Sequence, residues 1–433
     1  MTLVELTPRP SDRLATLPVV IIGAGPIGLA AAANLVERGI DFTVLEAGDD
    51  IADSMRAWGH TRLFSPWKHL VDPASTRLLE AAGWQVPSPE RAPTGTELRE
   101  GYLAPLAALD TIAGRIRTGT EVVGVAREGM DRTRTAGRDR TPFLVRIRTA
   151  DGLDEIPARA VIDASGTYRS PNPLGSAGLE PLGRAEIEDL AEPALPDVLG
   201  VDRARFAGRH TTVVGAGHSA ANTLLALVQL AREAPGTRVA WLIRNASAVR
   251  VSSSDDDGLP GRASLGARVE AAVRRGDIDV VDRFEIERVR RVDAGARLIG
   301  RRAGRAAAHD TDRIVNATGF RPELAMLREI RLELDEVVEA PARLAPLIDP
   351  NLHSCGTVAP HGFAELRHPE PGFFIVGMKS YGRAPTFLLK TGYEQVRSVT
   401  AWLGGDLGAA TNVELELPAT GVCSTSGGAG CCR

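Results

Sequence analysis

The chain contains few of the residues on which several common protein classes depend. It has four cysteines in 433 residues and neither a C-x-x-C nor a C-x-x-x-x-C pair, which argues against a disulfide framework and a redox-active dithiol. Aromatic residues make up 4% of the chain and the net charge is −4, so nucleic acid is not an expected partner. No apolar run approaches the length of a membrane span, and residues 1–17 lack the apolar core of a signal peptide. We therefore expect a cytoplasmic protein without a membrane partner.

The clearest positive feature is an apolar run, residues 19–22, that ends in G-x-G-x-x-G and passes into an alanine-rich segment. The run is typical of a buried strand, and the alanine-rich segment is typical of a helix packed closely on it. In a dinucleotide fingerprint, Gly23 permits a tight turn, Gly25 lets a pyrophosphate approach the backbone, and Gly28 lets helix and strand pack closely. The next strand-like run ends in Glu46, which suits hydrogen bonds from a ribose diol. A buried βαβ unit without a nucleotide is the alternative interpretation.

The same order of motifs returns in residues 211–243, where a short apolar strand precedes the pattern G-x-G-x-x-A. Gly215 and Gly217 are its two glycines, and a helix and a further strand follow. That strand ends in Arg244 and Asn245 instead of an acid, and an arginine there favours the 2′-phosphate of NADPH over the free hydroxyl of NADH. Two such units, one with an acid and one with an arginine, indicate FAD and NADPH held for hydride transfer.

Two other segments have both a functional and a structural interpretation. Residues 47–73 look irregular, and their aromatic side chains either line a ligand pocket or belong to a core. Residues 132–140 are basic and lie between two strand-like runs, so we expect a solvated hairpin tip.

The remaining chain offers weaker signals. Similar Ala-Ser/Thr-Gly turns follow apolar strands at residues 164–166 and 317–319. A last apolar strand, residues 372–376, runs into a glycine turn, and a long helix is expected over residues 384–403. Residues 404–433 are small, polar and glycine-rich, which is typical of a flexible tail.

With these motifs, the chain resembles flavoproteins with two dinucleotide-binding domains, a group that includes flavin-containing monooxygenases, Baeyer–Villiger monooxygenases and thioredoxin-reductase-like enzymes. The resemblance implies an α/β fold with two Rossmann-type domains, in which the NADPH domain is inserted into a split FAD domain. The divisions that we expect are residues 1–170 for the first part of the FAD domain, 171–311 for the NADPH domain with its connection, 312–405 for the second part of the FAD domain, and 406–433 for a flexible tail that contains cysteines.

The fingerprints and the resemblance together indicate the cofactor-binding residues. On the FAD side these are Gly23, Gly25, Pro26, Gly28, Glu46, Trp58, Val123, Gly166, Gly377, Met378 and Lys379. On the NADPH side these are Gly215, Gly217, His218, Ser219, Arg244 and Asn245. We expect the His218 side chain itself to face solvent at a turn. The segment 377–379 matches the place where this group sets a helix N-terminus under the flavin, and such a dipole stabilises negative charge. Ser65, Trp67 and Lys379 are the candidate catalytic residues.

Three stretches, residues 64–67, 196–200 and 367–386, are similar to flavoprotein monooxygenases of bacterial arsenic-resistance clusters. This resemblance implies a class B-like monooxygenase that uses NADPH, FAD and O2 to oxidise a small-molecule substrate at sulfur, nitrogen or a metalloid through a C4a-peroxyflavin. One departure matters. The signature F-x-G-x-x-x-H-x-x-x-[YF] is not intact, because Thr212 occupies its histidine position.

Two other functions remain open, a reductase or oxidase that inserts no oxygen and a nucleotide-loaded sensor that has lost catalysis. In the first alternative, Cys423, Cys431 and Cys432 serve as a thiol relay or as ligands of a thiophilic metalloid, since soft thiolates select soft ions. A homodimer is compatible with each of these functions.

Overall fold

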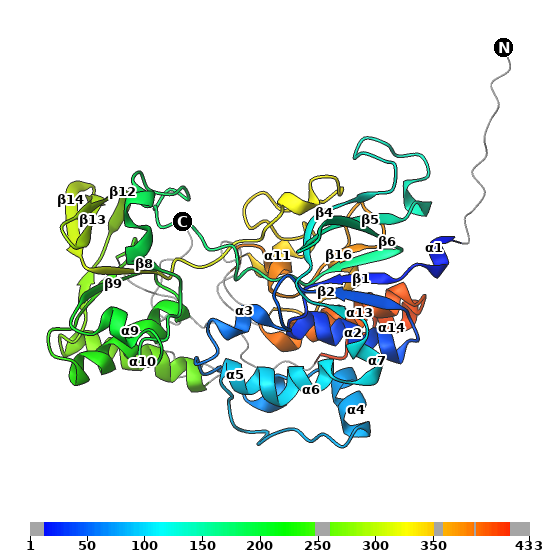
Figure 1. Ribbon diagram of the computed structural model, residues 1–433, viewed down its shortest axis with the longest axis horizontal. Helices are drawn as coiled ribbons and strands as arrows, with labels where there is room; N and C mark the ends of the chain where they lie inside the picture. Colours follow the sequence, from blue (N-terminus) through cyan, green and yellow to red (C-terminus); the bar gives the residue numbers. More distant parts are fainter. Residues whose placement is uncertain (1–12, 247–259, 350–357, 385–386, 416–433) are drawn as a thin grey trace, which may run out of the picture.

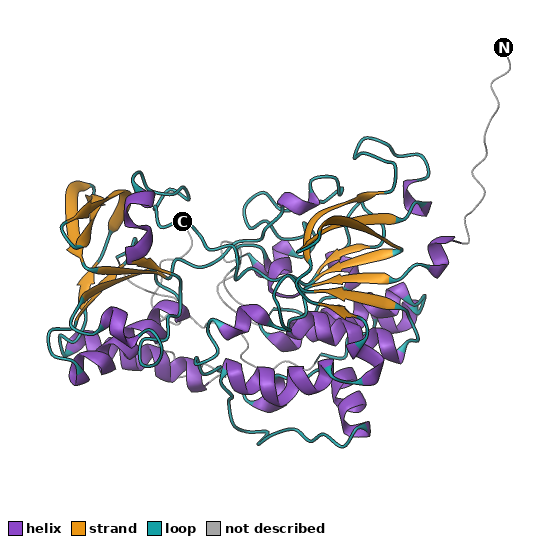
Figure 2. Cartoon of the chain, in the orientation of Figure 1, coloured by secondary structure: helices purple, strands orange, loops and turns teal. Residues whose placement is uncertain are grey.

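The computed structural model describes residues 13–246, 260–349, 358–384 and 387–415, and shows two α/β bodies (Figure 1). Each body has three layers, with helices on one face of a parallel sheet and a three-stranded antiparallel sheet on the other face (Figure 2). No helix among these residues is long and apolar enough to cross a membrane.

The first body is built on a parallel sheet of order β16-β7-β1-β2-β3. In β1, Val19 and Ile21 belong to the core under the helices, while Val20 and Ile22 belong to the core under the antiparallel sheet. Burial on both faces explains the uninterrupted apolar run. The strands are β1 (Val19–Ile22), β2 (Phe42–Leu45), β3 (Ile116–Arg117), β4 (Glu121–Arg127), β5 (Phe143–Thr149), β6 (Gly152–Ala158), β7 (Ala160–Asp163) and β16 (Phe373–Ile375). The helices are α1 (Arg13–Thr16), α2 (Pro26–Glu37), α3 (Asp53–Arg56), α4 (Pro73–Ala81), α5 (Gly95–Leu98), α6 (Ala104–Ala107), α7 (Asp110–Ala113), α11 (Ala345–Ile348), α12 (Phe363–Leu366), α13 (Leu389–Leu403) and α14 (Leu407–Thr411).

The second body repeats this plan with a parallel sheet of order β11-β10-β9-β15-β8. Its antiparallel sheet β12-β13-β14 lies in the chain between β11 and β15, as β4-β5-β6 lies between β3 and β7 in the first body. The strands are β8 (Ala191–Glu192), β9 (His210–Val214), β10 (Arg238–Leu242), β11 (Asp279–Val281), β12 (Phe284–Val292), β13 (Gly295–Arg302), β14 (Arg305–Thr311) and β15 (Arg313–Asn316). The helices are α8 (Arg203–Phe206), α9 (His218–Glu233) and α10 (Pro260–Arg274).

Two antiparallel crossings connect the bodies. Pro171 and Phe320 form a β-bridge, and the Asn172 N–H donates to the Gly319 carbonyl at 2.9 Å. The rings of Tyr168 and Phe320 pack with their centroids 5.2 Å apart. The second body is therefore an insertion in the first, as the resemblance implies.

The expected boundary at residue 312 needs a correction. β15 pairs in parallel with β9 and β8, so this strand belongs to the second body. The chain re-enters the core of the first body only near Leu327. The boundary between the second body and the second part of the first body therefore lies at the crossing near Phe320, because β15 pairs on both sides within the second sheet.

The expectation of a solvated tip at residues 132–140 is wrong for Arg138, which is 3% exposed. Its guanidinium donates to both carboxylate oxygens of Glu370, at 2.7 and 2.9 Å to Oε2 and at 3.1 Å to Oε1. Arg127 donates to the same carboxylate at 2.8 Å and lies over the Phe143 ring. Burial by itself would raise the pKa of Glu370, but the bonds from Arg138 and Arg127 hold that pKa below its usual range.

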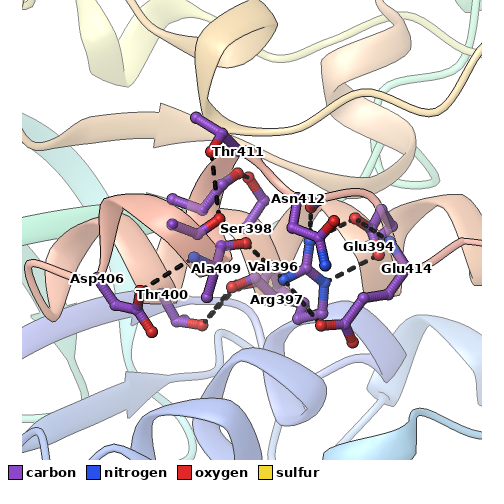
Figure 3. A network of polar contacts seen from close by, with 12 residues as sticks. Glu394, Val396, Arg397, Ser398, Thr400, Asp406, Ala409, Thr411, Asn412 and Glu414 are labelled. Carbon is purple, nitrogen blue, oxygen red and sulfur yellow. Dashed lines mark hydrogen bonds and ion pairs between the residues drawn. The ribbon is translucent and has the colours of Figure 1, made fainter.

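The predicted tail begins later than residue 406, because α14 packs on α13 (Figure 3). Arg397 forms an ion pair with Glu394 at 2.6 Å and donates to the Ala409 carbonyl at 2.8 Å. The Ser398 hydroxyl donates to the Ala410 carbonyl at 2.6 Å. The long helix begins at Leu389 instead of 384. Cys423, Cys431 and Cys432 lie outside the described residues.

Candidate functional site

The glycines of the first fingerprint have three different surroundings. Gly23 has φ +98°, and a Cβ there would lie 2.9 Å from the Ala164 carbonyl oxygen. A Cβ on Gly28 would lie 1.9 Å from the Gly23 carbonyl oxygen, because α2 packs tightly on β1. A Cβ on Gly25 would meet nothing within 4 Å. This open cradle at the N-terminus of α2, where Pro26 is the first helical residue, fits the pyrophosphate of a dinucleotide.

Glu46 lies beside this cradle and is 8% exposed. Its carboxylate accepts hydrogen bonds from the N–H groups of Ala24 and Gly48, both at 2.9 Å. The two bonds fix the carboxylate at the carboxyl end of β2. Each oxygen still has acceptor capacity, so the group fits the ribose diol that the sequence predicts for it.

Two further FAD-side predictions lie around the same edge. Val123 is the residue at the β-bulge of β4, where the register shifts between Val122 and Gly124. Gly166 follows β7 with φ +70°, and a Cβ on it would meet no atom within 4 Å. The space at Gly166 would let a nucleotide approach its backbone, and the contacts of both residues with a nucleotide stay predictions.

The second cradle has the same design. Gly215 has φ +130°, and a Cβ there would lie 2.1 Å from the Ala317 carbonyl oxygen, whereas a Cβ on Gly217 would meet nothing within 4 Å. Fully buried Ala220 takes the place of the third glycine. His218 and Ser219 begin α9, so their backbone groups border the open position.

Matching backbone hydrogen bonds align the two bodies residue by residue. The Gly23 N–H donates to Leu45 O in the first body, and the Gly215 N–H donates to Leu242 O in the second. The residue that follows Leu45 is Glu46, and the residue that follows Leu242 is buried Ile243. The second cradle therefore has an apolar residue where the first has its carboxylate. Because this position holds no carboxylate, a 2′-phosphate would meet no negative charge there.

Arg244 and Asn245 come directly after Ile243. The Arg244 guanidinium donates to the Ser176 carbonyl at 3.1 Å, and the Asn245 carbonyl accepts from the Arg283 N–H at 3.2 Å. Both residues thus lie at the carboxyl edge of β10, where the sequence places them. Arg283, in contact with Asn245, was not foreseen.

The arm that contains Ser65 and Trp67 belongs to the first body. Trp67 is 1% exposed in the core beside Gly101, and its indole N–H has no partner among the described residues. Ser65 is half-buried. Trp58 packs against Gly95, where a Cβ would lie 2.8 Å from its ring. The burial of Trp67 favours the structural interpretation of this residue, while the role of Ser65 stays a prediction.

A neighbour of Ser65, Phe64, reaches the second body. Its ring lies edge-on to the His218 ring with centroids 5.2 Å apart. The expectation that the His218 side chain faces solvent is therefore wrong. Sequence alone could not pair two rings from different domains.

Lys379 forms a buried ion pair at the junction between the two parts of the first body. Its Nζ lies 2.6 Å from Asp163 Oδ2, and both side chains are 0% exposed. The Lys379 Nζ also donates to the Ser165 hydroxyl at 3.1 Å, and that hydroxyl donates to Asp163 Oδ1 at 2.6 Å. The ammonium is thus buried and bonded to both Asp163 and Ser165, which favours a positioning role for Lys379, while its catalytic role stays a prediction.

Gly377 and Met378 lie in the turn that carries Lys379. The Gly377 N–H donates to the Gln395 side-chain oxygen at 2.7 Å, and the Gln395 amide nitrogen lies 2.9 Å from both His361 Nε2 and Ser380 Oγ. Burial lowers the pKa of His361, so the ring stays neutral and can accept from Gln395. The turn is thereby fixed to α13.

No group of three or more His, Cys, Asp or Glu side chains in the described part of the chain forms a metal site.

Two nucleotide cradles, an inserted domain and a buried junction define a flavoprotein oxidoreductase with two dinucleotide-binding domains. The family of pyridine nucleotide-disulphide oxidoreductases matches residues 20–350, and the chain belongs to it. The predicted fold class and the prediction of an enzyme that uses FAD and a pyridine nucleotide are confirmed at this level.

The individual proteins that the chain resembles share less than 30% of their residues with it. Indole-3-pyruvate monooxygenase YUCCA1 of Oryza sativa subsp. japonica is 28% identical over 281 residues, which cover 61% of this chain and 55% of that protein. The chain thus spans about half the length of this curated relative. The bacillithiol disulfide reductase of Bacillus cereus has a TM-score of 0.65 at 20% identity, covering 90% and 99% of the two chains. The cadaverine monooxygenase DfoA of Erwinia amylovora, solved with FAD, has a TM-score of 0.61 at 14% identity, covering 95% and 99%.

Proposed function

We propose that the protein is a class B-like flavin monooxygenase that uses FAD and NADPH to oxidise a small molecule at a soft nucleophilic atom. The observation that carries this proposal is the pair of open cradles, one beside Glu46 and one beside Ile243 and Arg244. The sequence has neither a C-x-x-C nor a C-x-x-x-x-C pair, and this absence and the similarity to a plant monooxygenase support oxygen insertion over disulfide reduction.

Each cradle has a defined task in this proposal. FAD bound in the first cradle would supply the redox chemistry, which is acceptance of a hydride from NADPH and activation of oxygen. The N-terminus of α2 binds the FAD pyrophosphate, and Glu46 accepts bonds from its ribose. The N-terminus of α9 binds the NADPH pyrophosphate, and Arg244 pairs with the 2′-phosphate. The Lys379–Asp163 pair holds the turn 377–381 against β7, so that the two parts of the split domain keep one geometry.

The test is the fate of oxygen after NADPH has reduced the flavin under nitrogen. Isotopically labelled O2 is then added with a thioether, a primary amine or a trivalent arsenical, and the masses of the products are measured by mass spectrometry. A labelled oxygen atom in one product supports the proposal. Complete conversion of the electrons to hydrogen peroxide with every substrate would show an oxidase, and a flavin that NADPH cannot bleach would indicate a sensor.

Gly217→Val is a matched control for this experiment. A Cβ at Gly217 meets no protein atom and the residue lacks positive φ, so the variant should fold. Its side chain would fill only the space reserved for the NADPH pyrophosphate. The variant should retain FAD, remain reducible by dithionite and lose reduction by NADPH.

A second candidate function is a reductase or oxidase that inserts no oxygen. It is favoured by the broken monooxygenase signature, since Thr212 is a buried residue of β9 whose hydroxyl lies 2.8 Å from His309 Nε2. The similarity of fold to a bacillithiol disulfide reductase is compatible with it. A role in arsenic resistance and metalloid capture by Cys423, Cys431 and Cys432 remain parts of the proposal that rest on the sequence alone.

A further inference from the structure

The internal alignment of the two bodies assigns an unusual position to Arg283. The Gly119 N–H donates to Gly48 O at 2.7 Å where the chain leaves β3, and the Arg283 N–H donates to Asn245 O where it leaves β11. The next residue donates to Glu46 O in the first body and to its counterpart, the Ile243 carbonyl, in the second. Arg283 is therefore the structural counterpart of Gly119.

Both positions have a left-handed backbone, with φ +57° at Gly119 and +50° at Arg283. Glycine adopts this conformation readily, whereas a residue with a Cβ is strained in it. Strained residues persist where the surrounding structure holds them, and they gather at functional sites. Because a glycine could make the same backbone bond without strain, the side chain of Arg283 calls for its own explanation.

That side chain lines an open pocket of about 470 Å³ together with Arg302 and Arg305. Asp282 forms ion pairs with Arg283 and Arg302, each with an N–O distance of 2.8 Å. Arg305 has no ion-pair partner among the residues that the structure describes. Three guanidinium groups against this one carboxylate leave an excess of positive charge, which suits a phosphate dianion.

The location of the pocket also suits a phosphate group of a coenzyme. It lies at the carboxyl edge of the second sheet, where Arg283 contacts the backbone of Asn245. Ligands of parallel α/β sheets bind at this edge, and an arginine near the end of the second strand accommodates the 2′-phosphate of NADP. Arg244 already donates one bond to the Ser176 carbonyl, and Arg283 brings a second arginine to this edge through its bond to Asn245.

We propose that Arg283 and Arg305 bind the 2′-phosphate of NADPH and, with Arg244, determine the preference for NADPH over NADH. The inference rests on the proposed use of NADPH by the second body. The strain at Arg283 is then the cost of bringing a second guanidinium to the phosphate from the end of β11.

The experiment measures binding of adenosine 2′,5′-bisphosphate and of ADP to the full chain by titration calorimetry. Loss of a charge-assisted bond should weaken the bisphosphate about tenfold in Arg283→Gly and in Arg305→Ala, with little change for ADP. Arg301→Ala is the matched control, because Arg301 lies on the same antiparallel sheet and pairs with Glu287 away from the pocket. Arg283→Gly should unfold at the same temperature as the wild type or a higher one, since glycine relieves the left-handed strain.

The possible failures are distinguishable. Equal losses for both ligands would show that Arg283 acts on the adenosine or the 5′-phosphate that the two ligands share and not on the 2′-phosphate, which overturns the inference. Unchanged binding in both variants, with a wild type that prefers the bisphosphate, would overturn it while leaving the proposed function intact. A wild type that does not distinguish the two ligands would overturn the proposed use of NADPH and the inference with it.

Discussion

Replacing Lys379 by methionine tests the buried junction of the split domain. The substitution keeps most of the side-chain volume but leaves the Asp163 carboxylate without its cation. Removing one partner of a buried ion pair costs about 3–5 kcal/mol. Asp163 Oδ1 keeps two bonds from Ser165, at 2.6 and 3.1 Å, so we expect a loss near the lower end, about 3 kcal/mol.

The assay is urea unfolding at a fixed FAD concentration, followed by flavin fluorescence, because bound FAD itself adds stability by mass action. The double variant Lys379→Met with Asp163→Asn should recover most of the loss, since it removes both charges together. A single variant as stable as the wild type would refute the reasoning. A double variant as unstable as the single one would place the effect in packing and not in charge. A double variant that is stable but cannot be reduced by NADPH would restore a catalytic role for Lys379.

Four further predictions concern the cofactors, the pH dependence and the tail. Glu46→Gln should weaken FAD by about 1.5–3 kcal/mol through loss of charge-assisted bonds to the ribose, measured by reconstitution of the apoprotein. Arg244→Ala should raise the KM for NADPH and leave that for NADH nearly unchanged in steady-state kinetics. Burial raises the pKa of Asp72 to about 6, so the folded state holds this proton more tightly than the unfolded chain, and stability present below about pH 4 is lost as pH rises through 6. Asp72→Asn should therefore gain urea resistance relative to the wild type above pH 6, by up to about 3 kcal/mol. Arsenite should consume three thiols in the reduced full chain and none of these in a chain that ends at Thr420.

Each of these expectations has an opposite result. Unchanged FAD affinity in Glu46→Gln would mean that the carboxylate only fixes the turn through Ala24 and Gly48. Equal changes for both coenzymes would remove Arg244 from the phosphate site. A stability difference for Asp72→Asn that is flat between pH 4 and 7 would show that Asp72 titrates normally. Equal arsenite binding with and without the residues beyond Thr420 would end the metalloid hypothesis for the tail.

The sequence predicted the two cradles well because their determinants are local. Gly23, Gly25 and Gly28 lie within six residues, and each is required by the geometry of one strand, one turn and one helix. The burial of β1 on both faces is visible as an uninterrupted apolar run. The repeat of the pattern at Gly215 predicted the second body, because its determinants are also local in the sequence.

Tertiary structure decided what depends on residues that are distant along the chain. Lys379 and Asp163 are 216 positions apart, and Glu370 pairs with Arg138 across 232 positions, so no local pattern distinguishes these buried ions from solvated ones. The strand end at Arg244 was readable, but the left-handed Arg283 beside it depends on how β10 and β11 pair. Sequence by itself thus determined which nucleotide-binding units the chain contains, since they are built from adjacent residues. The structure determined which charges are buried, which rings meet between the bodies and which arginines share a pocket, because these are outcomes of packing.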